Sequence, residues 1–339
     1  MDIPAGIPAA NGSGSADLDR PAHVLALDIG GTKLAAAVVD AAGQARSFLV
    51  ERSRTELGAD AVLADLFRLG RSAVSAAGVP WDEIGAVGIG CGGPLDARRG
   101  ILLAPPHLTG WHDIPVRALA EQAFERPATL ENDATAAAAA EHRYGAGVGT
   151  RNMVYLTIST GVGGGVVIDG RLYRGAAGNG GELGHVTVDR HGRVCRGCGR
   201  RGCLEAYASG TSIAERAAEA GLHGATAEDV AAAARAGEPV ASAVWEETIE
   251  ALACGLTSIV NLFEPELVVL GGGVTRSGEQ LLGPVRTLVR DGAMAPAGEV
   301  ASIVTAALGD RVGVVGAAAI VHAAAEDAAE AETEAVGGG

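Results

Sequence analysis

One plan of short apolar segments and glycine turns occurs twice along the chain, and it limits the fold more than any other feature. In each copy an apolar segment leads into a glycine turn, further apolar segments follow, and helical patterns come after them. Such segments are typical of strands, and strands alternating with helices favour an α/β fold. The duplication predicts two similar lobes with a cleft between them, a common place for a ligand. The expected strands are 23–28, 34–39, 48–50, 84–89 and 128–130 in the first copy, and 154–158, 166–168 and 267–270 in the second.

The helical patterns lie between and after these strands. Apolar residues in 61–77 recur with the spacing of an amphipathic helix. Residues 1–20, rich in Ala, Gly, Pro and Ser, are expected to form a disordered leader, and 327–339 to form a tail after a frayed helix end. The other expected helices are 115–124, 134–144, much of 212–263, and 316–325.

Composition excludes several classes of protein. The formal charge is −15 and aromatic residues make up 3% of the chain, so a nucleic-acid-binding surface is not expected. The longest apolar run, 312–321, is much shorter than the roughly 20 residues that a membrane helix needs. The N-terminal segment has no basic stretch followed by an apolar one, which argues against a signal peptide. We therefore expect a cytoplasmic protein that binds neither nucleic acid nor membrane.

The first glycine turn follows the first strand, in the segment Asp28–Lys33. Backbone amides can approach a phosphate where no side chain intervenes, and a carboxylate at the strand end can hold a metal ion through water. Lys33 is the only lysine in the chain and lies inside this motif. The alternative is a tight turn that Asp28 merely caps, and the hexapeptide alone does not decide between them.

A second glycine loop, Ser159–Gly165, follows the strand that begins at Val154. It is neither a P-loop nor a dinucleotide-binding fingerprint, because the Lys-Ser/Thr ending and the following helix are missing. The alternative is a glycine-rich hairpin. Two such turns, one in each lobe, fit a nucleotide held from both sides. A third candidate, Gly271–Gly273, suits the close passage of an adenosine.

Asn132 and Asp133 lie between an expected strand and an expected helix. Asn and Asp are common N-cap residues, and sequence context alone favours that role. A carboxylate at a strand end facing a cleft could instead accept a proton from a substrate hydroxyl.

Three thiols and an imidazole are close enough in sequence to form a zinc site. Cys195, Cys198 and Cys203, together with His185, supply the ligands of a tetrahedral Cys₃His site. A redox pair would use only Cys195 and Cys198, leaving the other two residues unexplained. Such a loop would bring Glu182 and Glu205 near His185, a combination that suits the hydroxyls of a sugar. The alternative is that both glutamates only support the metal ligands.

Together these motifs resemble the ROK family of repressors and kinases, within the actin-like/sugar-kinase superfamily. The resemblance extends from about His23 to Val321. It implies a two-lobed actin-like (ribonuclease H-like) ATPase fold with a central cleft. The lobes would be 21–131 and 132–311, the second carrying the zinc loop, and a helix at about 312–326 would pack back on the first. The motifs that carry it are Asp28–Lys33, Leu130–Ala134, Gly161–Gly165, Glu182–His185 and Cys198–Glu205.

The chain looks most like the bacterial glucokinases of this family. That likeness implies ATP-dependent phosphorylation of a hexose, usually at the 6-hydroxyl, in a cleft that closes over the sugar. It also implies a homodimer or homotetramer acting in carbohydrate metabolism and glycolysis, with Mg²⁺ and a structural Zn²⁺. Asp133 would be the general base and Asp28 would help to place Mg²⁺–ATP. Sugar contacts would be Asn132, Glu182, His185 and Glu205, and nucleotide contacts Gly30, Gly31, Thr32, Lys33, Thr160, Gly161, Gly163, Gly164, Gly271, Gly272 and Gly273.

Two departures from the family pattern concern the zinc loop and the sugar. Cys195 is displaced by one residue, giving Cys-x-x-Cys, and His107 occupies a place where related glucokinases often carry Asn. An N-acetylhexosamine kinase, acting on N-acetylmannosamine or N-acetylglucosamine, is therefore the first alternative. A sugar-responsive ROK regulator is disfavoured because a Gly/Pro/Ala-rich stretch, not a helix-turn-helix domain, precedes Asp28. An ATPase without a sugar acceptor is disfavoured by Glu182, His185 and Glu205. Whether polyphosphate can replace ATP stays open.

Overall fold

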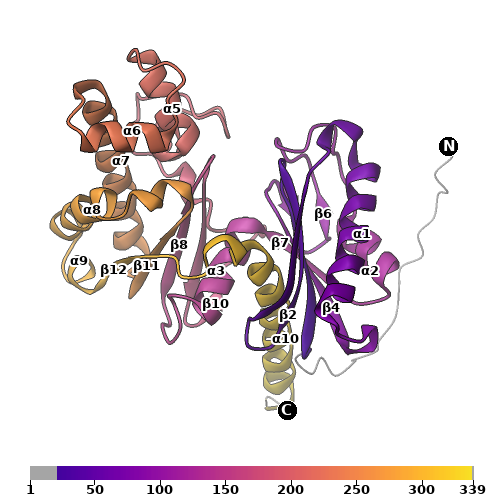
Figure 1. Ribbon diagram of the computed structural model, residues 1–339. Coiled ribbons are helices and arrows are strands. Elements are labelled where there is room, and N and C mark those ends of the chain that lie inside the picture. Colours follow the sequence, from indigo (N-terminus) through magenta and orange to yellow (C-terminus); the bar gives the residue numbers. More distant parts are fainter. Residues whose placement is uncertain (1–20, 338–339) are drawn as a thin grey trace.

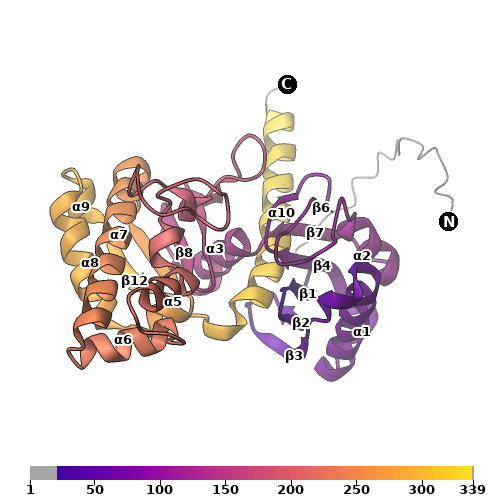
Figure 2. The same cartoon turned by 90° about the horizontal axis from the view of Figure 1, so that it is seen from above.

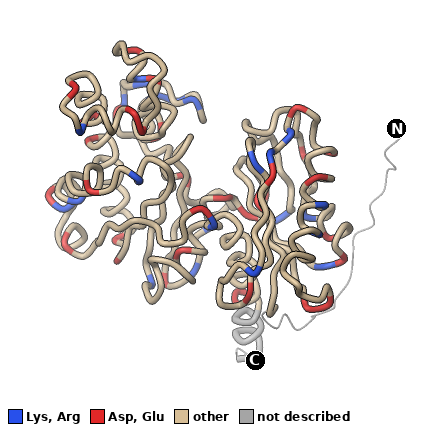
Figure 3. Tube along the Cα trace, in the orientation of Figure 1, with Lys and Arg blue, Asp and Glu red and all other residues tan. Residues whose placement is uncertain are grey.

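The computed structural model describes the backbone of residues 21–337 and the side chains of 21–328, so the leader expected at 1–20 lies outside the described residues. Two lobes stand side by side, each built around a five-stranded mixed sheet (Figure 1). Among the described helices, none is long and apolar enough to cross a membrane. Basic and acidic residues are interspersed over both lobes (Figure 3).

The N-terminal sheet has the strand order β3-β2-β1-β4-β7. Its first three strands form the antiparallel meander that the sequence predicts, and β1, β4 and β7 run parallel. Helices α1 and α2 cover one face, where α1 buries Leu66 and α2 buries Phe124. The bounds are β1 His23–Ile29, β2 Lys33–Asp40, β3 Ala45–Arg52, α1 Ala59–Ala77, β4 Ile84–Cys91, β5 Leu95–Asp96, β6 Ile101–Leu102, α2 Val116–Phe124 and β7 Ala128–Asn132.

The C-terminal sheet repeats this plan with the order β10-β9-β8-β11-β12. Again the first three strands are antiparallel, and β8, β11 and β12 run parallel. The duplicated pattern in the sequence is therefore a duplicated sheet. The bounds are β8 Met153–Ile158, β9 Val162–Ile168, β10 Arg171–Leu172, α4 Glu205–Ala208, α5 Gly210–Glu219, α6 Ala227–Arg235, α7 Pro239–Phe263, β11 Leu267–Gly271, α8 Glu279–Gly292, α9 Ala297–Val300 and β12 Ser302–Thr305.

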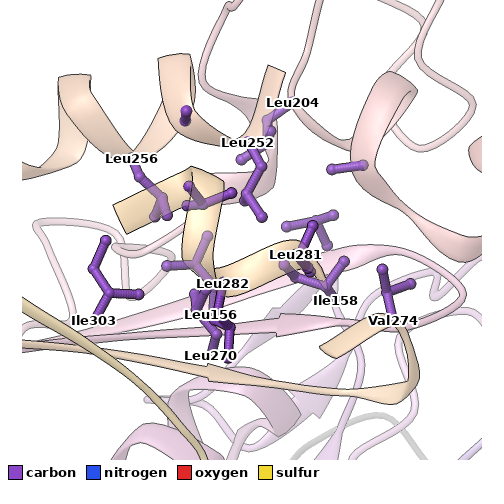
Figure 4. Close-up of a cluster of buried hydrophobic side chains, with 14 of the residues drawn as sticks. Leu156, Ile158, Leu204, Leu252, Leu256, Leu270, Val274, Leu281, Leu282 and Ile303 are labelled. Atoms are coloured by element: carbon purple, nitrogen blue, oxygen red, sulfur yellow. The ribbon is translucent and has the colours of Figure 1, made fainter. Parts of the chain in front are cut away.

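The largest core lies between the C-terminal sheet and the helices α7 and α8 (Figure 4). Leu156 and Leu270 come from the parallel strands β8 and β11, while Leu252 and Leu281 come from the covering helices. All four side chains are buried. Strands buried on both faces read as continuous apolar runs, which is why β11 was recognisable from its sequence.

Two helices lie between the sheets: α3 (Asp133–Tyr144) and α10 (Val312–Gly337) (Figures 1 and 2). The first packs on β8 and β9, and the second on α3, β4 and β1. Small residues permit the close approach, since a Cβ on Gly88 would overlap the backbone of Ala317. The chain crosses from the first sheet to the second at the start of α3, and returns through 306–311 before α10.

Two sequence expectations need correction. Strand β9 begins at Val162, so three of the glycines expected in a loop lie in a strand. Helix α10 continues to Gly337, although 327–339 was expected to be a tail. Ala and Glu are among the best helix formers, and neither Gly nor Pro interrupts the segment before Gly337, so the helix has no stop signal there.

Candidate active site

The first glycine turn joins β1 to β2 and lies beneath another loop of the same lobe. The Gly30 amide donates to the Lys33 carbonyl at 3.0 Å, which closes the turn. A Cβ on Gly31 would come within 2.8 Å of the His107 carbonyl oxygen, so the loop around His107 lies directly over the turn. Thr32 and Lys33 are exposed at the start of β2. The turn is thus tight, and its outer side chains remain available to a ligand.

The segment Asn132–Asp133 ends β7 and begins α3. Asn132 is the N-cap: its Oδ1 accepts from the amides of Ala134 at 2.9 Å and Thr135 at 3.2 Å. The capping interpretation is therefore right for Asn132. Asp133 uses one carboxylate oxygen to accept from Ala134 at 2.8 Å, and its side chain remains exposed. A free oxygen at the start of α3 can accept a proton or orient a hydroxyl.

Carboxylates from both lobes converge on Asp133. The side chain of Asp133 is open to solvent, but the surrounding protein still desolvates the carboxylate and raises its pKa. The hydrogen bond from the Ala134 amide and the charge of His107 oppose that rise. Burial raises the pKa of Asp28 to about 7, with a further rise from the charge of Asp133 and an opposing effect from Lys33. The pKa of Glu182 is also raised, mainly by burial and in part by Asp133.

We refer to Asp28, His107, Asn132, Asp133, Glu182 and His185 as the interlobe site. The His107 ring packs on Gly92, where a Cβ would lie 2.6 Å from its Cε1. The pKa of His107 is lowered, because the effect of burial exceeds the opposing effect of the Asp133 charge. Mutual repulsion among the acidic groups leaves the site ready for a cation or for hydroxyl donors, because either would relieve it.

The four expected zinc ligands form a single cluster. One ligand atom from each of His185, Cys195, Cys198 and Cys203 lies within 4.8 Å of the others. The Cys198 and Cys203 sulfurs are 3.5 Å apart, and Cys195 Sγ lies 3.7 Å from His185 Nδ1. Zinc–sulfur bonds of about 2.3 Å in a tetrahedron place sulfurs roughly 3.8 Å apart, so these residues fit the ion. The displaced Cys195 is part of the cluster.

Glu182 and Glu205 make different contacts around His185. Glu182 Oε2 lies 4.0 Å from His185 Nε2, the ring nitrogen that a metal on Nδ1 would leave unbound. Glu205 instead holds the loop that carries the cysteines to β9, accepting from the Val162 amide at 3.0 Å and from Cys195 at 3.2 Å. Glu182 thus belongs to the interlobe site, whereas Glu205 has a clear supporting contact.

A cavity of about 600 Å³ lies in the C-terminal lobe beside the second and third glycine motifs. Thr160 and Gly273, both expected to contact a nucleotide, line it. Gly272, with φ of 89°, makes the turn that leads from β11 to Gly273, and a Cβ there would overlap the Ile158 carbonyl. The rest of the lining was not expected from the sequence, because single polar residues on separate elements carry no local signal. These residues include Thr211, Thr226, Arg235 and Arg276.

Gly163 and Gly164 have a packing explanation that the sequence did not reveal. Both lie in β9, paired with β8. A Cβ on Gly163 would come within 2.8 Å of the Ala134 Cβ, and one on Gly164 within 2.8 Å of Leu183. Gly161, in contrast, lies in the turn beside Glu205. The close packing of α3 on β9 therefore requires Gly163, and the approach of the Gly181–Leu183 segment requires Gly164.

A family profile described as the ROK family matches residues 24–324. A glucokinase from Thermotoga maritima is 34% identical over 88% of this chain and 96% of its own length. An N-acetylmannosamine kinase from Escherichia coli is 40% identical over 74% of this chain and 82% of its own length.

A solved structure is similar to the described fold as a whole. It is a ROK family glucokinase from Streptomyces griseus in complex with glucose and AMPPNP, and it superposes with a TM-score of 0.72 at 34% identity. The similarity covers 88% of this chain and 98% of the other. The family profile, which matches residues 24–324, includes every residue of the interlobe site.

Proposed function

Because this chain belongs to the ROK family, we propose that it is a sugar kinase, a glucokinase that transfers the terminal phosphate of ATP to the 6-hydroxyl of glucose. The observation that carries the proposal is the interlobe site. Asp133 stands at the start of α3, and its charge raises the pKa of both Asp28 from the first lobe and Glu182 from the second. The nucleotide-sized cavity beside Thr160 and Gly273 supports the choice of ATP.

In this proposal Asp133 hydrogen-bonds the sugar 6-hydroxyl and aims its oxygen at the terminal phosphorus. The new O–P bond forms as the bond to the ADP oxygen breaks, and the hydroxyl proton passes to Asp133 and then to water. Phosphoryl transfer depends on alignment and charge neutralisation more than on a strong base, so an aspartate suffices. Asn132, Glu182, His185 and Glu205 are the proposed contacts of the sugar.

Asp28 and the glycine turns would hold the nucleotide. Bound Mg²⁺ would neutralise phosphate charge, and Asp28 is the residue that we propose to place it, through water. Gly30, Gly31, Thr32, Lys33, Thr160, Gly161 and Gly271–Gly273 are the proposed contacts of ATP. Zinc, held by His185 and the three cysteines, would fix the loop that presents Glu182 and His185.

The N-acetylmannosamine kinase is a second candidate, favoured by the 40% identical relative. His107, which lies over the Asp28–Lys33 turn, is one position where the two activities could be distinguished. We further propose a cytoplasmic homodimer or homotetramer acting at the first step of glycolysis.

The experiment is a coupled assay that measures ADP formation with glucose, mannose, fructose, N-acetylglucosamine and N-acetylmannosamine in turn. We expect the highest kcat/KM with glucose. A higher value with N-acetylmannosamine would favour the second candidate, and ADP formation independent of any sugar would contradict both. Replacing ATP with polyphosphate, and measuring sugar phosphate directly, identifies the phosphate donor.

A further inference from the structure

We propose that Arg174 is a positioning residue that fixes both the catalytic segment Asn132–Asp133 and the loop that leads to Glu182. Arg174 follows β10 in the C-terminal lobe and contacts the end of β7 in the N-terminal lobe. The inference rests on the proposed function, because it assigns Arg174 a part in holding the sugar site together.

The first step is the contact with Glu131. Arg174 Nε donates to Glu131 Oε2 at 2.8 Å, and the Glu131 side chain is only 2% exposed. The other oxygen of Glu131 accepts from the Asn132 amide at 3.0 Å. Each carboxylate oxygen of Glu131 thus accepts one hydrogen bond, one from Arg174 and one from the Asn132 amide. Arg174 therefore positions the backbone of the catalytic segment through Glu131. A buried carboxylate without its partner would have to shift or draw in water.

The second step is the backbone of Arg174. Its carbonyl accepts from the Gly180 amide at 2.9 Å, and the preceding Tyr173 amide donates to Val166 of β9 at 2.8 Å. A Cβ on Gly180 would lie 2.9 Å from the Arg174 carbonyl carbon, so the loop closes tightly on itself. Glu182 comes two residues after this closure. Arg174 therefore begins the loop that ends at the proposed sugar ligands.

The third observation provides a matched control. A second nitrogen of Arg174, Nη1, donates to Asp327 of α10 at 3.3 Å. Asp327 is 46% exposed, and exposed ion pairs contribute little to stability. Removal of Asp327 takes one ion pair from the same arginine without disturbing Glu131. Any effect specific to the catalytic segment should therefore follow Arg174 and Glu131, and not Asp327.

The test compares R174Q, R174K, E131Q and D327N with the wild type in the coupled assay. We expect R174Q to lower kcat about tenfold or more and to raise the sugar KM, with the ATP KM unchanged, since small misplacements of reacting groups cost rates of this order. R174K should recover part of the lost kcat, because it keeps the charge opposite Glu131. The kcat and KM values of D327N should stay within about twofold of those of the wild type. The R174Q/E131Q double variant should lose no more kcat than R174Q alone if the two residues act through one contact.

Wild-type kcat and sugar KM in both R174Q and R174K would overturn the inference, as would an equal rise in the ATP and sugar KM values. Should R174Q fail to fold, the R174Q/E131Q double variant takes its place with the same expected losses, because it removes the buried charge together with its partner. A wild-type protein that phosphorylates no sugar would contradict the proposed function and this inference with it. An active wild type with unaffected variants would contradict this inference alone.

Discussion

At the scale of single residues, the ionised acidic groups of the interlobe site destabilise the folded protein. Asp28, Asp133 and Glu182 all have raised pKa values, each mainly because the surrounding protein desolvates the carboxylate. A raised carboxyl pKa means that the folded state resists ionisation and loses stability as the pH rises. Groups selected for stability alone would not be arranged in this way, whereas a site that receives Mg²⁺–ATP and sugar hydroxyls gains from it.

Asp28 gives this idea a direct test. Its pKa is about 7 in the folded protein, against 3.8 for an ordinary aspartate. The ligand-free protein therefore loses stability between about pH 4 and pH 7, where the unfolded chain has ionised and the folded one has not. D28N removes the charge, so at pH values above 7 we expect it to unfold at a higher temperature than the wild type. This difference in unfolding temperature should shrink as the pH falls toward 4.

The control is D82N, which changes an exposed aspartate on the same lobe. Its unfolding midpoint should follow the wild type at every pH. A D28N variant that is less stable than the wild type at pH 8 would contradict the assignment of a strained charge to Asp28.

At the scale of elements, glycines serve two purposes that a substitution can separate. A Cβ on Gly165 of β9 would come within 2.5 Å of the Ala138 Cβ, whereas one on Gly273 would meet nothing within 4 Å. We expect G165A to lower the free energy of unfolding by about 1–3 kcal/mol through overpacking against α3. G273A should leave stability unchanged and raise the ATP KM, because it lines the nucleotide cavity. The opposite pattern, measured by denaturant unfolding and initial rates, would reverse the two roles.

The zinc loop makes a second prediction at this scale. Cys198 is exposed, so C198S removes a proposed metal ligand with little loss of core packing. We expect C198S to contain less than one zinc per chain by elemental analysis, to unfold at a lower temperature, and to bind sugar more weakly, because metal binding stabilises the fold of its loop. C254S, at an exposed cysteine on α7, is the matched control and should retain the metal. Zinc-free wild-type protein with full activity would contradict this account.

Elements were more predictable from sequence than the tasks of their residues. The strands of the N-terminal sheet, together with β8, β9 and β11, were expected as apolar segments, whereas β10 and β12 at the edges of the C-terminal sheet were missed. Helices α1, α2 and α3 lie close to their expected bounds. The sequence of Gly161–Gly165 does not show which glycines lie in the turn and which lie in the strand. A glycine that lets a phosphate approach the backbone and a glycine that lets Ala134 or Ala138 pack against it cannot be told apart from sequence alone. The end of α10 was missed because the Ala- and Glu-rich segment before the final glycines was interpreted as a polar tail, although both residues are strong helix formers.

At the scale of the whole molecule, the duplicated pattern predicted two lobes, and both sheets have the same strand order. The assembly of the site was less accessible, since Asp28, His107, Asp133 and Glu182 come from four separate segments. Only the resemblance to a family grouped most of them in advance. The contact of Arg174 with Glu131 has no sequence signature, because it depends on how one lobe sits on the other.

The arrangement of the crossings predicts how the lobes respond to ligand. They are linked by the start of α3 and by 306–311, and Glu141 of α3 accepts from the amides of Ala307 at 3.0 Å and Leu308 at 2.9 Å. The return crossing is thus held to α3, the helix at whose start the first crossing lies, which suits a hinge. We expect small-angle scattering to show a smaller radius of gyration when glucose is added. The same radius with and without the preferred sugar would contradict closure.

The most direct measurement concerns Asp133. We compare D133N with the wild type for sugar binding by calorimetry and for turnover in the coupled assay with ATP. The account predicts a sugar dissociation constant close to that of the wild type and a kcat lowered about 10²-fold or more, since the amide cannot take the hydroxyl proton. A D133N protein that binds the sugar and turns it over at the wild-type rate would contradict the account.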